Sequence, residues 1–170
     1  MLINQFDLGS IKKNKITLVK NFVSLERNYD FNFISDLIEE NNLIIQQKSS
    51  IGNLKDVFQI VKVSSILKEF KIFLDFLSKL FKYERDAKDE VDLFFNLVSQ
   101  VGNSHIDEED VFIIGLKGTT IYRVFDIENK DYTIEKGDMI FIPRGISHKA
   151  IGLTPRIIAS IGFYGKRLDG

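Results

Sequence analysis

The sequence predicts a mainly β domain, built as an antiparallel sandwich or barrel such as a jelly roll and preceded by helical elements. The first observation behind this prediction is a change in hydrophobic periodicity. Residues 1–90 have mostly helical spacing, whereas residues 91–170 contain short β-branched and aromatic runs. The second observation is that turn residues separate these runs at close spacing, as in antiparallel sandwiches. A length of 170 residues with 44% hydrophobic content fits a single domain with its own core.

The N-terminal part contains a short β-branched run at residues 16–23, which we predict to be a strand. An amphipathic helix follows at residues 31–40, where apolar side chains recur at i, i+3, i+4 and i+7. Residues 43–47 favour a second short strand. These elements would lead into the β half of the chain.

A longer helix is predicted from about Leu54 or Val57 to Tyr83, with a wide Phe-rich face opposite a charged one. Packing of this face on the core is the commoner fate of such a stripe. A homodimer through the Phe-rich helix at residues 57–83 is the alternative. The polar residues 85–92 are predicted to form a solvated hinge.

Short strands fill the C-terminal half of the chain. Two polar stretches, residues 128–131 and 135–138, are typical of the turns between strands. The six predicted strands cover residues 93–99, 111–116, 120–125, 132–134, 139–142 and 156–163.

The composition argues against several classes of function. With 23 basic and 24 acidic residues, the net charge of -1 gives no electrostatic case for nucleic acid or an anionic membrane as a partner. The absence of cysteine excludes disulfides, thiolate catalysis, thiolate zinc sites and iron–sulfur clusters. We see no secretory signal, and no apolar run approaches the ~20 residues of a membrane span. We therefore expect a soluble cytoplasmic protein.

The only two histidines of the chain stand where a metal site would need them. His105 and Asp107 are two residues apart, so on an extended segment both side chains project to the same face. His148 follows a turn containing Pro143 and Gly145, which can direct it inward. Two histidines and one carboxylate form the facial triad of non-haem Fe(II) oxygenases. We predict that these three residues bind the metal and form the catalytic centre.

The acidic residues that follow Asp107 offer an alternative carboxylate. Glu109 or Asp110 would then replace Asp107 in the triad. Otherwise residues 108–110 are predicted to be a solvated turn.

Residues 137–148, Gly-Asp-Met-Ile-Phe-Ile-Pro-Arg-Gly-Ile-Ser-His, have the form Gly-x5-Pro-x-Gly-x2-His, which resembles the second motif of the cupin superfamily. The first cupin motif, His-x-His, is replaced here by His105-Ile-Asp107. Residues 105–124 are instead similar to the His-x-Asp segment of the JmjC-like branch, which includes bacterial ribosomal-protein hydroxylases and related asparaginyl and histidinyl hydroxylases. The resemblance covers about residues 92–164 and implies a double-stranded β-helix, the cupin-like jelly roll.

The resemblance also implies an Fe(II)- and 2-oxoglutarate-dependent oxygenase that hydroxylates an amino acid, a peptide or a protein side chain. In this family a Lys or Arg pairs with the distal carboxylate of 2-oxoglutarate, and the corresponding position here is Thr120. Because a buried carboxylate is costly without a cation, we expect another basic residue to replace it. The predicted co-substrate residues are Arg156, Thr120, Asn96, Tyr122 and Lys117, with Arg123 as a further basic candidate.

Two other functions stay open. A metal cupin that does not use 2-oxoglutarate, such as a dioxygenase or isomerase, would explain why Thr120 stands where a cation is expected. A non-catalytic cupin would bind a ligand or a partner without metal-dependent turnover. Iron is inferred from the family resemblance, because two histidines and a carboxylate bind the first-row divalent ions with little selectivity. Since the family's hydroxylases carry further domains, we expect either a minimal version acting on a small substrate or a dimer through the Phe-rich helix.

Overall fold

The structure, a computed structural model, describes residues 1–4, 11–12, 14–47, 57–125 and 128–168. Its helices are α1 (Phe31–Asn41) and α2 (Lys68–Leu80), and a 3-10 turn, η2, covers Val63–Ser65. Its strands are β1 (Leu2–Ile3), β2 (Thr17–Val19), β3 (Val23–Ser24), β4 (Gln46–Gln47), β5 (Phe58–Ile60), β6 (Glu90–Asn96), β7 (Gln100–Val101), β8 (His105–Ile106), β9 (Asp110–Lys117), β10 (Thr120–Phe125), β11 (Asn129–Ile134), β12 (Met139–Ile142), β13 (Ser147–Gly152) and β14 (Arg156–Phe163).

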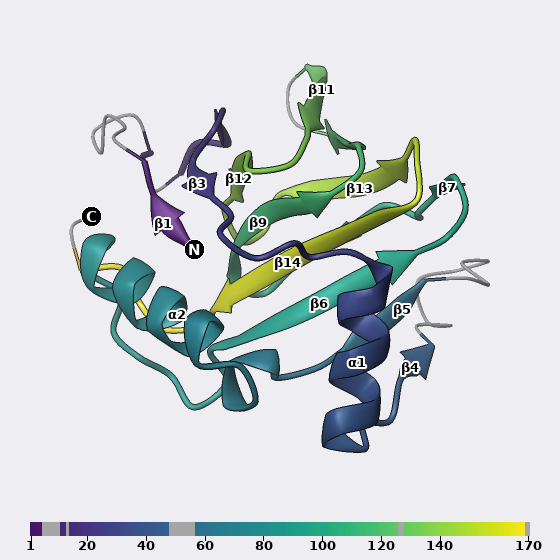
Figure 1. The fold of residues 1–170 in the computed structure, drawn as a ribbon. Coiled ribbons are helices and arrows are strands. Elements are labelled where there is room, and N and C mark those ends of the chain that lie inside the picture. The colour runs from purple at the N-terminus through teal and green to yellow at the C-terminus, as the bar shows by residue number, and fades with distance from the viewer. Residues whose placement is uncertain (5–10, 13, 48–56, 126–127, 169–170) are drawn as a thin grey trace.

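Two antiparallel sheets form the centre of the molecule (Figure 1). The larger sheet has seven strands in the order β2-β12-β9-β14-β6-β5-β4. The smaller sheet has five strands, with β11, β10, β13 and β7 in order and β8 paired to β13. This mainly β architecture confirms the predicted fold class and is consistent with a jelly roll. The predicted helical character of residues 1–90 is met only in part, because short strands stand between the helices.

Each face of the larger sheet has its own hydrophobic layer, because successive side chains of a strand point to opposite sides. On β9, Phe112 and Ile114 join the core that includes the buried residues of α1 and α2. Val111 and Ile113 join a second core with residues of the smaller sheet. The same alternation on β14 places Arg156 on the face of Ile158, which belongs to this second core. Arg156 therefore projects between the sheets.

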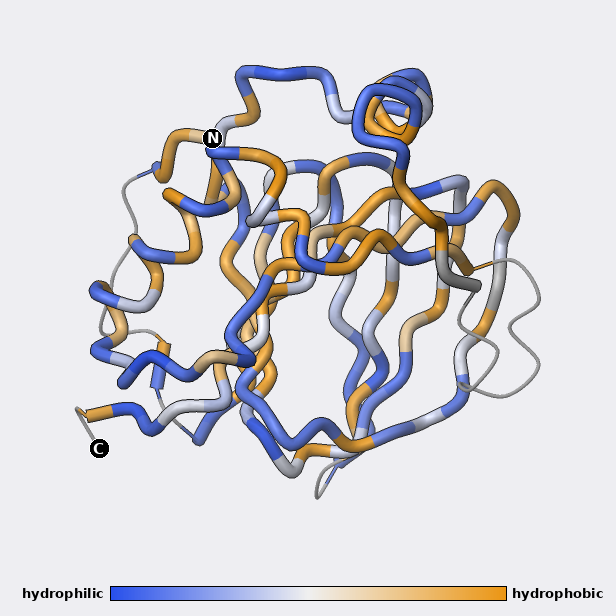
Figure 2. Tube along the Cα trace, turned by 90° about the horizontal axis from the view of Figure 1, so that it is seen from below, coloured by the Kyte–Doolittle hydropathy of each residue, from blue (hydrophilic) through white to orange (hydrophobic). Residues whose placement is uncertain are grey.

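The helices form where their apolar residues can cover the outer face of the larger sheet. At the start of α1, the Asp30 carboxylate accepts a hydrogen bond of 3.0 Å from the Phe33 N–H. The helix ends at Asn41 and is capped by Asn42, whose backbone is left-handed. Figure 2 shows hydrophobic and hydrophilic residues alternating along the helices, as one-sided burial requires. The buried residues of α2 are Phe70, Phe73, Leu74, Leu77 and Ser78.

Phe112 lies at the centre of an aromatic cluster between α2 and the larger sheet. Its ring is fully buried and lies 5.0 Å from Phe81 and 4.7 Å from Phe141, centroid to centroid. Replacement of Phe112 by alanine should lower the free energy of unfolding by about 3–5 kcal/mol, because it leaves a large cavity. Urea denaturation measures this loss. Phe76→Ala is the control, since that side chain is 41% exposed and should cost far less; equal losses would contradict the central position of Phe112.

The predicted helix from residue 54 or 57 to 83 is wrong in its first part. Residues 54–56 lie outside the described residues, and Phe58–Ile60 form strand β5, where Phe58 pairs with Phe95 of β6. Lys62 adopts a left-handed backbone with φ of 54°. Pairing with β6 and this turn override the apolar periodicity, so the helix begins only at Lys68.

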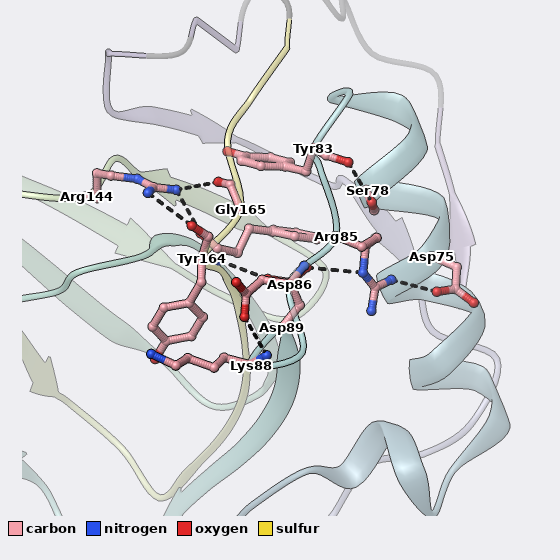
Figure 3. A network of polar contacts seen from close by, with 11 residues as sticks. Asp75, Ser78, Tyr83, Arg85, Asp86, Lys88, Asp89, Arg144, Tyr164 and Gly165 are labelled. Carbon is pink, nitrogen blue, oxygen red and sulfur yellow. Dashed lines mark hydrogen bonds and ion pairs between the residues drawn. The ribbon is translucent and has the colours of Figure 1, made fainter.

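The predicted hinge at residues 85–92 is wrong in its second half, because residues 85–88 are exposed but residues 89–92 are not. Strand β6 begins at Glu90, and Asp89 before it is buried rather than solvated. The Asp89 carboxylate accepts hydrogen bonds from the backbone N–H groups of Asp86 and Tyr164, each at 2.9 Å, and forms an ion pair with Arg85 (Figure 3). Local polarity therefore marks a tightly bonded turn here.

The remaining strand predictions differ in quality. The strands at residues 120–125, 139–142 and 156–163 are confirmed at both ends, and the strand at 111–116 is one residue longer on each side. The strand at 93–99 is observed three residues earlier, at Glu90–Asn96. The predicted strands at 16–23 and 43–47 contain only shorter segments.

The predicted turn at 128–131 is wrong, because β11 begins at Asn129 and pairs with β10. Strands β7, β8 and β13 were not predicted.

No helix in the described part of the chain is both long and apolar enough to cross a membrane.

Candidate metal centre

The two histidines are direct cross-strand neighbours. His105 on β8 and His148 on β13 are paired in the register of the smaller sheet, and their ring centroids lie 4.4 Å apart. Asp107 follows β8 directly, and the backbone N–H of Gly145 donates to the Asp107 carbonyl at 3.0 Å. Strand pairing thus brings together residues that are far apart in the sequence.

The three side chains converge on one point. His105 Nε2 lies 3.5 Å from Asp107 Oδ1, and His148 Nε2 lies 3.4 Å from Asp107 Oδ2. One possible ligand atom from each residue lies within 4.8 Å of the others, so the group can hold a metal ion. The predicted alternatives, Glu109 and Asp110, are not part of this group.

The other nitrogen of each imidazole contacts a backbone carbonyl. His148 Nδ1 lies 3.0 Å from the Ile146 oxygen, and His105 Nδ1 lies 3.3 Å from the Asn103 oxygen. Since a carbonyl can only accept, Nδ1 is the nitrogen that carries the hydrogen in the neutral rings. The Nε2 lone pairs then face the common point, which is the arrangement that metal-binding histidines adopt. The donor set therefore fits a divalent transition metal.

Burial lowers the pKa of His148 below its usual value, because the protonated ring would be poorly solvated. The Ile146 carbonyl and the Asp107 charge oppose this effect, while His105 adds to it. A lowered pKa favours the neutral imidazole, which is the form that binds metal.

A pocket of about 550 Å³ opens beside the three ligand side chains, between the inner faces of the two sheets. Tyr122 and His148 line it from the smaller sheet, and Arg156 and Ile158 line it from the larger one. Glu109 and Tyr164 lie at its side. This volume is sufficient for a small co-substrate and part of a substrate.

Arg156 is the basic residue that the structure places in the pocket. Its side chain is buried, and Nη1 lies 3.5 Å from Thr120 Oγ1, at the limit of a hydrogen bond. Among the described residues no carboxylate forms an ion pair with it. Burial lowers the pKa of Arg156, although a guanidinium remains charged. A Cβ atom on Gly152 would lie 2.4 Å from Nη1, so glycine at this position makes room for the guanidinium.

The other predicted co-substrate residues are placed differently. Tyr122 lines the pocket, and Asn96 is the cross-strand partner of Arg156 but does not line the pocket. Lys117 is not among the lining residues, and its ammonium group lies 6.0 Å from the ring centre of Phe31. Arg123 is exposed and forms a bidentate ion pair with Asp131. The structure thus places Arg156 and Tyr122 in the pocket. Thr120 contacts Arg156 but, like Asn96, does not line the pocket, and Lys117 and Arg123 lie outside it.

Several lining residues were not recognised as site residues in the sequence. Glu109 is one of them, because the sequence suggested it only as a substitute metal ligand. Burial and the Asp107 charge raise the pKa of Glu109, whereas its hydrogen bonds, including one from the Tyr164 hydroxyl, lower it. Gln59 is another; its Nε2 donates to Asp92, while its buried Oε1 has no partner among the described residues. Polar residues at alternate positions of β6 and β14 were the available signal, because they indicate a face that is only partly packed as core.

Comparison with known proteins gives a match to a family model over part of the chain. Residues 121–168 match a family model described as JmjC domain. Two curated relatives are Probable inactive acireductone dioxygenase 1 of Caenorhabditis elegans, 28% identical over 82 residues, and Probable inactive acireductone dioxygenase 2 of Caenorhabditis briggsae, 28% identical over 90 residues. These matches cover 45% and 50% of this chain, and 50% of each relative.

Solved structures of YcfD, a ribosomal oxygenase from Escherichia coli, share the fold. One crystal structure superposes with a TM-score of 0.72 at 18% identity and covers 99% of this chain and 54% of YcfD. A YcfD complex with cobalt and 2-oxoglutarate has a TM-score of 0.65 at 18% identity, over 91% of this chain and 49% of YcfD. The chain spans about half the length of these relatives. By sequence over residues 121–168 and by fold over most of its length, the protein resembles the JmjC-like cupin oxygenases, which confirms the resemblance that its motifs predict.

Proposed function

We propose that the protein is an Fe(II)- and 2-oxoglutarate-dependent oxygenase that hydroxylates a side chain of an amino acid, a peptide or a protein. One observation carries this proposal. A group of two histidines and an aspartate shares a pocket with a buried arginine that has no carboxylate partner among the described residues.

His105, Asp107 and His148 would hold the metal. Two imidazoles and a carboxylate occupy one face of an octahedron and leave the opposite positions open. When bound there, iron supplies the oxygen chemistry, with a chelating 2-oxoglutarate as the source of electrons. The protein's own part is to orient the ligands through Nδ1 and to keep His148 unprotonated by burial.

Arg156 would bind the distal carboxylate of 2-oxoglutarate. A buried cation is costly without an anion, and a guanidinium pairs with a carboxylate through two parallel hydrogen bonds. The Thr120 hydroxyl does not line the pocket; it accepts from Arg156 Nη1 and so helps to hold the guanidinium in place. Burial raises the pKa of Tyr122 well above its usual value, so its hydroxyl stays protonated and can donate. Arg156 on β14 would thereby replace the cation that the family has at the position of Thr120.

The substrate would extend toward β5 and β6, away from Arg156 along the sheet. Gln59 and Asp92 line this part of the pocket, and the Asp92 carboxylate holds the Gln59 amide nitrogen at 2.5 Å. The amide oxygen is buried and has no partner among the described residues. A substrate N–H or O–H donor would reach it only if the Gln59 side chain moves.

Turnover of 2-oxoglutarate tests the proposal without a known substrate. The protein with Fe(II), oxygen and 2-oxoglutarate should release succinate slowly even when no substrate is added, and the Asp107→Ala variant should not. A cupin dioxygenase or isomerase without 2-oxoglutarate is the alternative, favoured by the absence of a cation at Thr120. It would bind iron yet release no succinate. A non-catalytic cupin would show neither property.

The homodimer prediction rests on the outer side of α2. Ile72 is 57% exposed and Phe76 is 41% exposed, although the rest of the apolar face packs on the core. If two copies associate through this side of α2, Ile72→Glu should convert the dimer to a monomer, because it would bury an unpaired charge in the interface. Light scattering after gel filtration measures the mass; a monomeric wild-type protein would contradict the prediction.

A further inference from the structure

A buried carboxylate, Asp110, and the guanidinium of Arg144 link the two chain segments that carry the three predicted metal ligands. We infer that this pair positions the ligands by fixing the distance between the two chain segments that carry them. The inference rests on the proposed metal centre, and it assigns Asp110 and Arg144 a role that differs from ligation. Neither residue lines the pocket.

Asp110 and Arg144 join the two segments at defined points. Asp110 follows Asp107 by three residues, and Arg144 precedes His148 by four. The Arg144 backbone N–H donates to Asp110 Oδ1 at 2.8 Å, and the guanidinium Nε donates to the same oxygen at 3.3 Å. Next to this pair, the Gly145 N–H donates to the Asp107 carbonyl at 3.0 Å. The turn that begins at one ligand is thus bonded to the turn that leads to another.

Asp110 is itself held from a third element. Its side chain is buried, and the Tyr83 hydroxyl donates to Oδ2 at 2.8 Å. Burial and the charge of Asp110 raise the pKa of Tyr83 well above its usual range, so this hydroxyl stays a donor. Both carboxylate oxygens have partners, as a buried charge requires.

Arg144 is anchored on its other side by the chain that leaves β14. Its guanidinium donates to the Phe163 carbonyl oxygen at 3.0 Å. It also donates to the carbonyl oxygens of Tyr164 and Gly165 at 3.2 and 2.8 Å (Figure 3). The planar fork of arginine can serve these acceptors and Asp110 together, whereas a lysine ammonium has no such geometry. The arginine therefore ties its own segment and the segment after β14 to one carboxylate.

The local backbone alone offers little rigidity at this place. Strand β8 has only two residues, and Gly145 adopts a left-handed backbone with φ of 81°. Metal ligands need distances within a few tenths of an ångström, and groups outside the ligand set commonly supply this precision. The Asp110–Arg144 pair is placed to do so.

The variants Asp110→Asn and Arg144→Lys test the inference in the full chain. The readout is the Co(II) affinity, from anaerobic titration followed by the visible absorption of bound Co(II), with thermal unfolding measured alongside. Asp110→Asn removes the charge at nearly constant shape, and we expect about 10–100-fold weaker Co(II) binding. Arg144→Lys should show a loss of the same kind, because it removes the fork and keeps the charge.

Asp89→Asn is the matched control. Asp89 is also buried and also holds the segment after β14, through the Tyr164 N–H (Figure 3). Among the described residues, neither its hydrogen bonds nor its ion pair reaches a ligand-bearing segment, so its loss should lower the unfolding temperature and leave Co(II) affinity nearly unchanged.

The outcomes separate the two claims. Tight Co(II) binding by the wild-type protein with unchanged affinity in Asp110→Asn would overturn the inference alone. An equal loss in Asp89→Asn would also overturn it, since general destabilisation would then suffice. If Asp110→Asn does not fold, Arg144→Lys decides by the same comparison. Absence of Co(II) binding by the wild-type protein would refute the metal centre itself, and the inference with it.

Discussion

Replacement of His148 by alanine should abolish binding of Fe(II) or Co(II) at concentrations that saturate the wild-type protein. Only His105 and Asp107 would remain, and two ligands on exposed or half-buried side chains hold a divalent ion poorly. Isothermal titration calorimetry under anaerobic conditions measures the affinity. The effect should be the largest of any single substitution, because His148 is the buried member of the group.

Lys149→Ala is the control for this substitution. Lys149 is the next residue of β13 and projects to the opposite face, where its ammonium group lies 5.6 Å from the Phe125 ring centre. It should bind metal as the wild type does. Metal affinity that survives in His148→Ala would mean that the ion binds elsewhere.

Replacement of Arg156 by alanine should weaken 2-oxoglutarate binding by about 30-fold or more and leave metal affinity nearly unchanged. Truncating one partner of a buried, hydrogen-bonded charge pair costs at least about 2 kcal/mol, which corresponds to that ratio. Calorimetric titration of 2-oxoglutarate into the metal-loaded wild-type and variant proteins measures the change in affinity.

Two further variants sharpen this prediction. Gly152→Ala should also weaken 2-oxoglutarate binding, because its Cβ would displace the Arg156 guanidinium without removing it. Arg123→Ala should have no effect, since Arg123 pairs with Asp131 at the surface. If Arg156→Ala bound 2-oxoglutarate as tightly as the wild type, the assignment of the carboxylate would be wrong.

The β half of the fold could be predicted because its strands carry strong local signals. Residues 120–125 and 156–163 are β-branched and aromatic, bounded by turn residues, and were predicted with their observed ends. The structure of residues 57–67 could not be predicted, because their apolar spacing also fits a helix. Only the pairing with β6 makes Phe58–Ile60 a strand. Strand β13 was missed because Ser147-His-Lys-Ala150 is polar at its start, and pairing with β8 and β10 makes it a strand.

The site shows a similar division. The spacing of His105 and Asp107 and the motif that ends at His148 predicted a group that the structure does bring together. Among the basic candidates, sequence alone could not separate Arg156 from Lys117, because the register of β14 against β6 and β9 decides which one faces the pocket. Asp110 was predicted to be solvated, whereas it is buried and accepts hydrogen bonds from Tyr83 and Arg144, which are distant in the sequence.

An anaerobic titration with Fe(II), in the presence and absence of 2-oxoglutarate, tests the central claim most directly. The claim is that the His105, Asp107 and His148 group and Arg156 bind metal and co-substrate together in one pocket. It predicts a visible metal-to-ligand charge-transfer band that appears only when Fe(II) and 2-oxoglutarate are both present, and that is absent in His148→Ala. Iron binding that 2-oxoglutarate leaves spectroscopically unchanged would contradict the claim and favour a metal cupin that does not use 2-oxoglutarate.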